Sequence, residues 1–113
     1  MERKKIKVYT KLDNIEDNYE ILAINIDNVI KYIDLSNNIM VIDMNQNIII
    51  RENNDYKFVI DFIHNEIDIY IKKYRKNIKK SIKTLILKKT KTSYLVRYSI
   101  YEEKIINEYY VKF

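Results

Sequence analysis

Cysteine, glycine and proline are all absent from the 113-residue chain, and alanine occurs once, at Ala23. Without cysteine the chain has no disulfide, no thiol nucleophile and no thiolate metal ligand. Without glycine it has none of the glycine-rich loops that cradle phosphates in P-loop and dinucleotide-binding proteins. Isoleucine, asparagine, lysine and tyrosine dominate instead, and because their codons are AT-rich we attribute the composition to genome bias. We expect asparagine to serve the tight turns, since it tolerates a positive φ better than the other remaining residue types.

Long apolar runs are missing as well. Stretches such as Ile39-Met40-Val41-Ile42 are far shorter than the roughly twenty residues of a membrane-spanning helix. Lys7 and Lys11 interrupt the N-terminal segment, so we expect no signal peptide. The hydrophobic fraction of 47% and the charged fraction of 33% are those of a globular chain. We therefore expect a single cytoplasmic domain over residues 1–113, with no membrane partner.

Alternation of apolar and polar residues runs through most of the chain, as is typical of strands with one solvent-facing side. Residues 6–12, 56–62, 67–71 and 94–100 are the clearest cases. Turn signals rich in asparagine and aspartate separate them, as far as Glu102-Glu103. The pattern predicts an all-β fold of eight to ten strands, and of a sandwich and a barrel we favour a small antiparallel meander barrel. No internal repeat or linker is expected.

Residues 15–26 also allow a helix. Four apolar residues there have helical spacing: Ile15, Tyr19, Leu22 and Ile26. Asp13 or Asn14 would cap such a helix. We favour a strand over residues 19–26, because the neighbouring segments all alternate.

The second half of the chain follows a known pattern: an arginine ending a strand before a turn, a strand closing on phenylalanine, and a C-terminal strand with paired tyrosines. The segments are 48–54, 56–62, Tyr74, 82–87, 95–100 and 109–113. On these residues the chain resembles the YwiB-like family of bacterial calycin-like β-barrels of unknown function. The resemblance implies a barrel related in shape to lipocalins and fatty-acid-binding proteins, which hold small ligands inside. It carries over no catalytic residue.

Charge is segregated along the chain. Residues 71–91 contain ten lysines and arginines and no acid, whereas the rest of the chain has eleven bases and sixteen acids. One interpretation is a solvated hairpin whose lysines protect a sheet edge. The other is a surface for an anionic partner such as single-stranded nucleic acid. The candidate anion-binding residues are Lys72, Lys73, Arg75, Lys76, Lys79 and Lys80.

The barrel interior is the other candidate site. The candidate ligand-binding residues are four tyrosines: Tyr70, Tyr74, Tyr94 and Tyr98. The strand face with Tyr94 and Tyr98 is the more apolar one, so we expect it to form the core and Arg97 to point outward. In the basic hairpin we expect four residues to face inward: Ile71, Ile82, Thr84 and Ile86.

Catalytic signals are weak. The only histidine, His64, is expected in a turn, and no nucleophile stands in a triad-like arrangement with it. Asp61, Glu66 and Asp68 offer a metal site with His64, but acids scattered on the wet faces of a hairpin explain them equally well. We predict no metal and no cofactor. The sequence therefore predicts a non-enzymatic protein that binds a small ligand in its interior; the alternative is a nucleic-acid or polyanion-binding module using residues 72–91.

Overall fold

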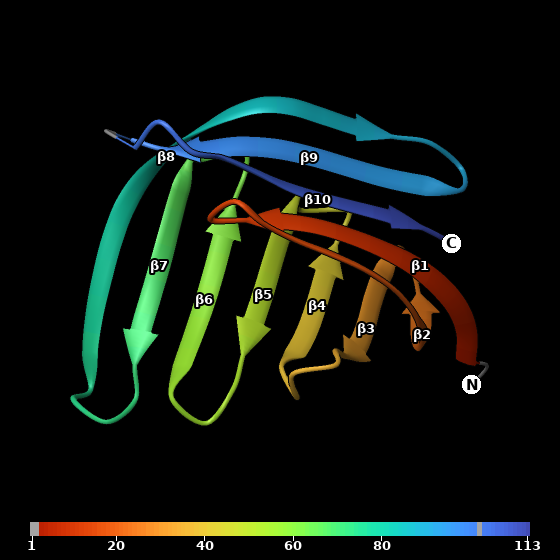
Figure 1. The fold of residues 1–113 in the computed structure, drawn as a ribbon, viewed down its shortest axis with the longest axis horizontal. Coiled ribbons are helices and arrows are strands. Elements are labelled where there is room, and N and C mark those ends of the chain that lie inside the picture. The colour runs from red at the N-terminus through yellow and green to blue at the C-terminus, as the bar shows by residue number, and fades with distance from the viewer. Residues whose placement is uncertain (1–2, 102) are drawn as a thin grey trace.

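The computed structural model describes residues 3–101 and 103–113, which form ten antiparallel strands (Figure 1). Met1, Glu2 and Glu102 lie outside the described residues. Of these, Glu102 belongs to the turn expected at Glu102-Glu103. The strands are β1 (Arg3–Leu12), β2 (Ile15–Ile26), β3 (Val29–Ile33), β4 (Ile39–Asp43), β5 (Ile48–Glu52), β6 (Tyr56–Asp61), β7 (Glu66–Ile71), β8 (Lys76–Lys89), β9 (Ser93–Ile100) and β10 (Ile106–Lys112). Each pairs with the next, and β10 pairs with β1, so the sheet closes. The all-β meander barrel is confirmed, and so is the strand interpretation of residues 19–26.

The described part of the chain contains no helix long and apolar enough to cross a membrane. Strands β3 to β7 stand side by side in one layer, and β9, β10 and β1 cross them in a second layer (Figure 1). Strand β8, with 14 residues, curves from the first layer into the second. Its first half pairs with β7 and its second half with β9.

A β-bulge interrupts β8 between Thr84 and Ile86. Because successive side chains of a strand point to opposite faces, the extra residue exchanges the two faces beyond it. Ile82 is buried before the bulge, whereas after it Ile86 is exposed and Leu87 packs against the core. The prediction that Ile86 faces inward was therefore wrong.

The core consists of the inward-facing residues of all ten described strands and two residues of the turns. Its buried hydrophobic members are Ile6, Val8, Ala23, Ile30, Tyr32, Met40, Ile42, Met44, Ile49, Ile60, Phe62, Ile67, Ile82, Tyr94, Val96, Tyr98, Tyr109 and Val111. The expected core face of β9 is confirmed. Arg97 lies on the outer face, where its Nε donates to Glu108 Oε1 at 2.6 Å.

Left-handed turn residues replace glycine throughout the fold. Eight described residues have positive φ: Asp13, Asn14, Asp27, Asn28, Asn37, Asn47, Asn65 and Arg75. The expectation that asparagine would serve the turns is confirmed, because it occupies five of these eight positions. Arg75, in the turn before β8, is the one basic residue among them.

The turns of a meander alternate between the two ends of the barrel. The turns after β1, β3, β5, β7 and β9 lie at one end, which we call the open end, and the turns after β2, β4, β6 and β8 lie at the closed end. At the closed end the buried side chains of Met44 and Phe62 close the core, and a pocket of about 370 Å³ lies beside Met44. At the open end two smaller pockets lie around Arg51.

The closed end contains an internal repeat. The pattern Val-Ile-Asp, a large apolar residue, two variable residues and Asn occurs at 41–47 and again at 59–65. In both copies the aspartate Oδ1 accepts two backbone N–H groups of the turn, and the asparagine has positive φ. The two tight turns therefore share one capping chemistry.

Candidate functional site

Two adjoining cavities lie inside the barrel at the open end. The first has a volume of about 140 Å³ and is lined by Thr10, Leu12, Asp17, Tyr19, Asp34, Leu35, Ser36, Asn38, Met40, Arg51 and Tyr109. The second has a volume of about 110 Å³ and is lined by Leu12, Asp13, Arg51, Phe58, Ile60, Ile67, Tyr98, Ile100, Asn107 and Tyr109. Leu12, Arg51 and Tyr109 line both cavities. Both are partly open to solvent, so the barrel has a recess at this end, with tyrosine and isoleucine among its walls.

Arg51 places a cation on the wall between these cavities. It follows Ile49 by two residues on β5, and since Ile49 is fully buried, Arg51 shares the inward face. Its neighbours across the sheet, Met40 and Phe58, line the cavities too. The guanidinium carbon lies 4.8 Å from the centroid of the Phe58 ring. This cation–π contact holds the guanidinium against the wall that carries Phe58.

No acid neutralises Arg51 in the described part of the chain. The ion pairs of that part join other residues, and none of its hydrogen bonds involves the Arg51 side chain. Asp34, which lines the same cavity, is occupied within its own loop: Oδ1 accepts the N–H groups of Ser36 and Asn38, each at 2.9 Å. The other oxygen, Oδ2, accepts the Asn38 side-chain amide at 3.0 Å.

Two buried tyrosines stand near Arg51. Burial raises the pKa of Tyr109 to about 12, and the Arg51 charge acts in the opposite direction. Burial also raises the pKa of Tyr98, again against the Arg51 charge. Neither hydroxyl has a hydrogen-bond partner among the residues that the structure describes. Both phenols are therefore protonated at neutral pH and able to donate a hydrogen bond into the cavities.

A second pair of tyrosines lies beside the first cavity. The Tyr19 and Tyr32 hydroxyls are 3.4 Å apart, and their rings are in tilted contact at 6.5 Å. Burial raises the pKa of both residues. This pair stiffens the wall between β2 and β3, where the two strands share only three register positions.

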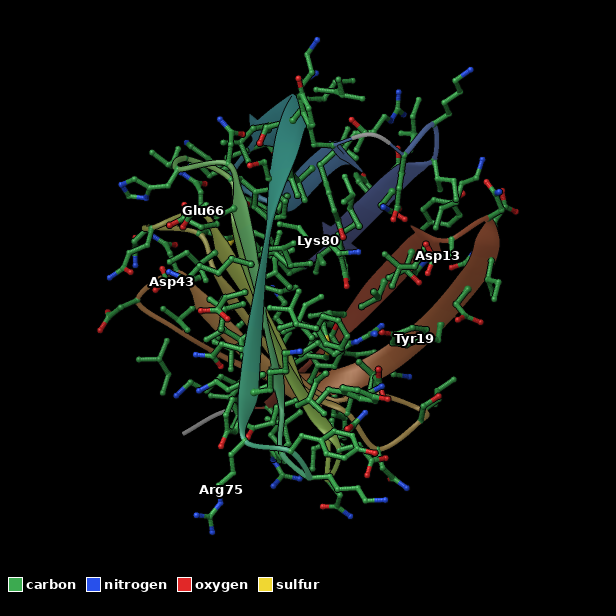
Figure 2. All side chains as sticks on the ribbon, turned by 90° about the vertical axis from the view of Figure 1, so that its left-hand side faces the viewer. Asp13, Tyr19, Asp43, Glu66, Arg75 and Lys80 are labelled. Atoms are coloured by element: carbon green, nitrogen blue, oxygen red, sulfur yellow. The ribbon has the colours of Figure 1, made fainter. Side chains whose placement is uncertain are left out.

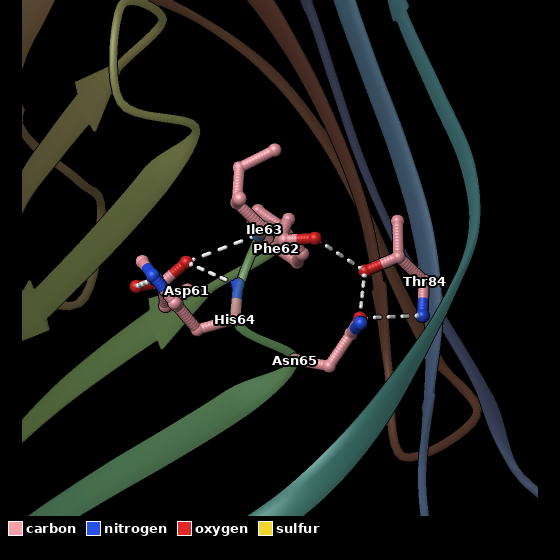
Figure 3. A network of polar contacts seen from close by, with 6 residues as sticks. All are labelled: Asp61, Phe62, Ile63, His64, Asn65 and Thr84. Atoms are coloured by element: carbon pink, nitrogen blue, oxygen red, sulfur yellow. Dashed lines mark hydrogen bonds and ion pairs between the residues drawn. The ribbon is translucent and has the colours of Figure 1, made fainter.

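At the closed end, buried side chains of the turns close the core. Met44 and Phe62 begin the turns after β4 and β6 and turn into the core, where the Phe62 ring packs 5.4 Å from that of Tyr98. Figure 3 shows how the turn after β6 is tied to β8: the Thr84 hydroxyl lies 3.0 Å from the Phe62 carbonyl oxygen and 2.8 Å from Asn65 Oδ1. Three left-handed asparagines complete this end, each with its carbonyl accepting an N–H from the next hairpin. The pairs are Asn28 with Met44 (3.0 Å), Asn47 with Phe62 (3.1 Å) and Asn65 with Ile82 (3.0 Å).

The four candidate tyrosines do not converge on one site. Tyr94 and Tyr98 are buried in the core, and only Tyr98 lines a cavity described above. Tyr70 lies on the outer face of β7, because its neighbour Ile69 faces the core. Tyr74 is 70% exposed in the turn between β7 and β8. The interior grouping of Tyr70 and Tyr74 was wrong, because the strand ends at Ile71 and the chain then leaves the barrel wall.

The six candidate anion-binding residues do not share one face either. Lys72, Lys73 and Arg75 lie in the turn at the tip of the β7–β8 hairpin, with Arg75 at its far end (Figure 2). On β8, Lys76 and Lys80 lie on the same side of the strand as the buried Ile82, whereas Lys79 lies on the opposite side. Figure 2 shows Lys80 in the region between the two layers, where its Nζ lies 3.9 Å from Glu103. Lys72 is paired with Glu52 at 2.9 Å. The one-face basic patch was therefore wrong.

His64 and its neighbouring acids do not form a cluster. His64 Nδ1 lies 2.7 Å from Asp61 Oδ2, while the main-chain N–H groups of Ile63 and His64 bind Asp61 Oδ1 (Figure 3). Burial tends to raise the pKa of Asp61, but these hydrogen bonds outweigh it and lower the pKa. In residues 3–101 and 103–113 no three histidine or acidic side chains are placed to hold a metal ion. The Asp61–His64 contact acts as a turn cap.

Comparisons with protein-family models, with curated proteins and with solved structures found no match. The functional residue that the sequence did not reveal is Arg51. In the sequence it is only the polar residue that ends a strand. The run Ile48-Ile49-Ile50 hides the strand phase, since apolar residues there occupy both faces. The cross-strand partners Met40 and Phe58 would have revealed it, but pairing is not visible in one sequence.

Proposed function

We propose that the protein is a non-enzymatic barrel that binds a small organic molecule at its open end. The observation that carries the proposal is the pair of adjoining cavities, which share Leu12, Arg51 and Tyr109. Cavities with apolar walls and a few convergent polar groups are the usual form of small-molecule sites. We also propose that the protein is related to the YwiB-like calycin family and lies in the cytoplasm.

The size of the cavities limits the ligand. An apolar cavity of about 150 Å³ accepts a benzene ring, so the two cavities suit a molecule of on the order of ten non-hydrogen atoms. A long acyl chain is too large for this space. The proposal is therefore a compact ligand, with one part in each cavity or folded around Arg51.

Methyl NMR tests this proposal. With methionine and leucine methyl groups labelled, titration with hexanoate, hexanamide and phenol is expected to shift the Met40 and Leu12 signals, since both residues line the first cavity. Met44 lines a separate pocket at the closed end, so a shift of Met44 without a shift of Met40 would place the probe there and contradict the proposal. If none of the three probes moves Met40 or Leu12 at millimolar concentration, the proposal is wrong.

Filling the cavities gives a matched variant pair. Leu12→Trp places a large ring at the wall common to both cavities and is expected to weaken probe binding at least tenfold, about 1.4 kcal/mol. Leu85→Trp makes the same change at a residue that is 41% exposed and is expected to leave probe binding unchanged. Equal behaviour of the two variants would contradict an interior site.

A second candidate function, nucleic-acid binding, is favoured by the tip of the β7–β8 hairpin. Tyr74 is exposed there, the Lys73 Nζ lies 5.6 Å from its ring centroid, and Arg75 projects beside it. A cation next to an exposed aromatic ring is the arrangement with which proteins hold a phosphate and a stacked base of a single strand.

Binding of an oligothymidine at several salt concentrations tests this second candidate. The double variant Lys73→Glu with Arg75→Glu is expected to reduce the salt slope by about 0.7 for each phosphate that the variant no longer neutralises. The control is Lys88→Glu with Lys91→Glu, which makes the same charge change near the closed end of β8. Equal reductions in the two variants would indicate net charge alone, and no salt-dependent binding of the unmodified protein would end this candidate.

A further inference from the structure

The unpaired charge of Arg51 indicates the chemistry of the ligand. An arginine does not lose its proton in a protein, so burial cannot be relieved by neutralising it. A partly buried charge without a partner is destabilising, and such a charge is normally found next to an opposite one. Arg51 has no acid within ion-pair distance in the described residues, although it lines both cavities. We therefore expect the ligand to carry the negative charge that pairs with Arg51.

The orientation of the guanidinium group selects the type of anion. The guanidinium carbon lies over the Phe58 ring, 4.8 Å from its centroid. An arginine stacked on an aromatic face keeps the N–H groups of its edge available for an anion. Two parallel N–H groups in one plane match the two oxygens of a carboxylate. The hydroxyls of Tyr98 and Tyr109, which have no partner in the described part of the chain, stand beside this position. Both are protonated donors at neutral pH.

The second cavity supplies the apolar part of the site. Phe58, Ile60, Ile67 and Ile100 line it, and none of these side chains offers a hydrogen bond. An apolar tail attached to a carboxylate on Arg51 would enter this space. Three acids also line the cavities: Asp17 and Asp34 the first, and Asp13 the second. Asp34 is held by its own loop, and none of the three forms an ion pair with Arg51 in the described residues.

We infer that the ligand is a small monocarboxylate with a short apolar tail, bound through its carboxylate to Arg51 and through its tail to the second cavity. This inference rests on the proposed interior binding and adds the charge of the ligand to it. Arg51 is the residue that determines specificity, and Phe58 holds it in place.

Hexanoate and hexanamide provide the test, because they have nearly the same shape and differ in charge. Unmodified protein is expected to bind hexanoate at least about tenfold more tightly than hexanamide, as measured by the Leu12 and Met40 methyl shifts. Arg51→Met, which keeps a long apolar side chain, is expected to bind both probes with equal affinity. Arg51→Lys keeps the charge without the paired N–H groups and is expected to fall between these two.

The outcomes distinguish the carboxylate assignment from the proposed interior binding on which it rests. If hexanamide binds as tightly as hexanoate to the unmodified protein, the carboxylate assignment is wrong and interior binding stands. If neither probe binds, both are wrong. If Arg51→Met or Arg51→Lys keeps the full preference for hexanoate, another residue recognises the charge and the assignment to Arg51 is overturned.

Discussion

Replacement of Phe62 by alanine is expected to lower the free energy of unfolding by about 3–5 kcal/mol, the usual cost of truncating a buried phenylalanine. Phe62 is 3% exposed and its ring packs against that of Tyr98 at the closed end. The substitution leaves a space in the core, and the surrounding turns are tied by hydrogen bonds that resist collapse into it. Urea denaturation followed by tyrosine fluorescence measures the change, since the chain has eleven tyrosines and no tryptophan.

The adjacent residue is the control for this prediction. Ile63→Ala removes a side chain of similar hydrophobicity in the same turn, but Ile63 is 55% exposed. Its cost is expected to stay within about 0.5 kcal/mol. Both substitutions keep the main-chain bond from Phe62 N to the Asn47 carbonyl. A cost for Phe62→Ala no larger than that for Ile63→Ala would show that the closed end is not a packed core.

The strands were predictable because their signal is local. A side chain on a strand has its face set by its immediate neighbours, so alternation such as that of Tyr94, Val96 and Tyr98 identifies both the strand and its buried side. The same reasoning correctly placed Arg97 outside. Closure into a barrel followed from the number of short strands and the absence of room for crossover helices, both of which are properties of the sequence.

Where the prediction failed, the cause was a change of phase or a partner distant in the chain. The bulge near Leu85 reverses the faces of β8, and nothing in the run of residues 82–87 marks the extra residue. Arg51 faces inward because of its register with Met40 and Phe58, and register is set by strand pairing. The cavities follow from the same long-range packing. The candidate site was therefore not visible as a motif, because none of its residues stands out in the sequence.

Asn47→Ala is expected to cost about 2–5 kcal/mol, because two separate penalties fall on one residue. Asn47 has φ of 56°, and alanine in the left-handed region costs roughly 1–2 kcal/mol. Its Oδ1 also accepts the hydroxyl of Tyr94 at 3.3 Å, and Tyr94 is fully buried. Leaving a buried hydroxyl without a partner costs about 1–3 kcal/mol. Asn47→Gly removes the second interaction and keeps the turn, so it is expected to show the hydrogen-bond cost with little backbone strain.

An exposed asparagine isolates the backbone penalty. Asn37 has φ of 62° in the turn after β3, and its side chain is exposed and makes no hydrogen bond within the described residues. Asn37→Ala is expected to cost about 1–2 kcal/mol and Asn37→Gly close to zero. At Asn47 the glycine variant is expected to remain destabilised, and combining it with Tyr94→Phe is expected to cost less than the two single changes added together, because both remove the same hydrogen bond. Full additivity in denaturation measurements would show that the Tyr94 hydroxyl does not depend on Asn47, and the closed end would then be held by packing and main-chain bonds alone.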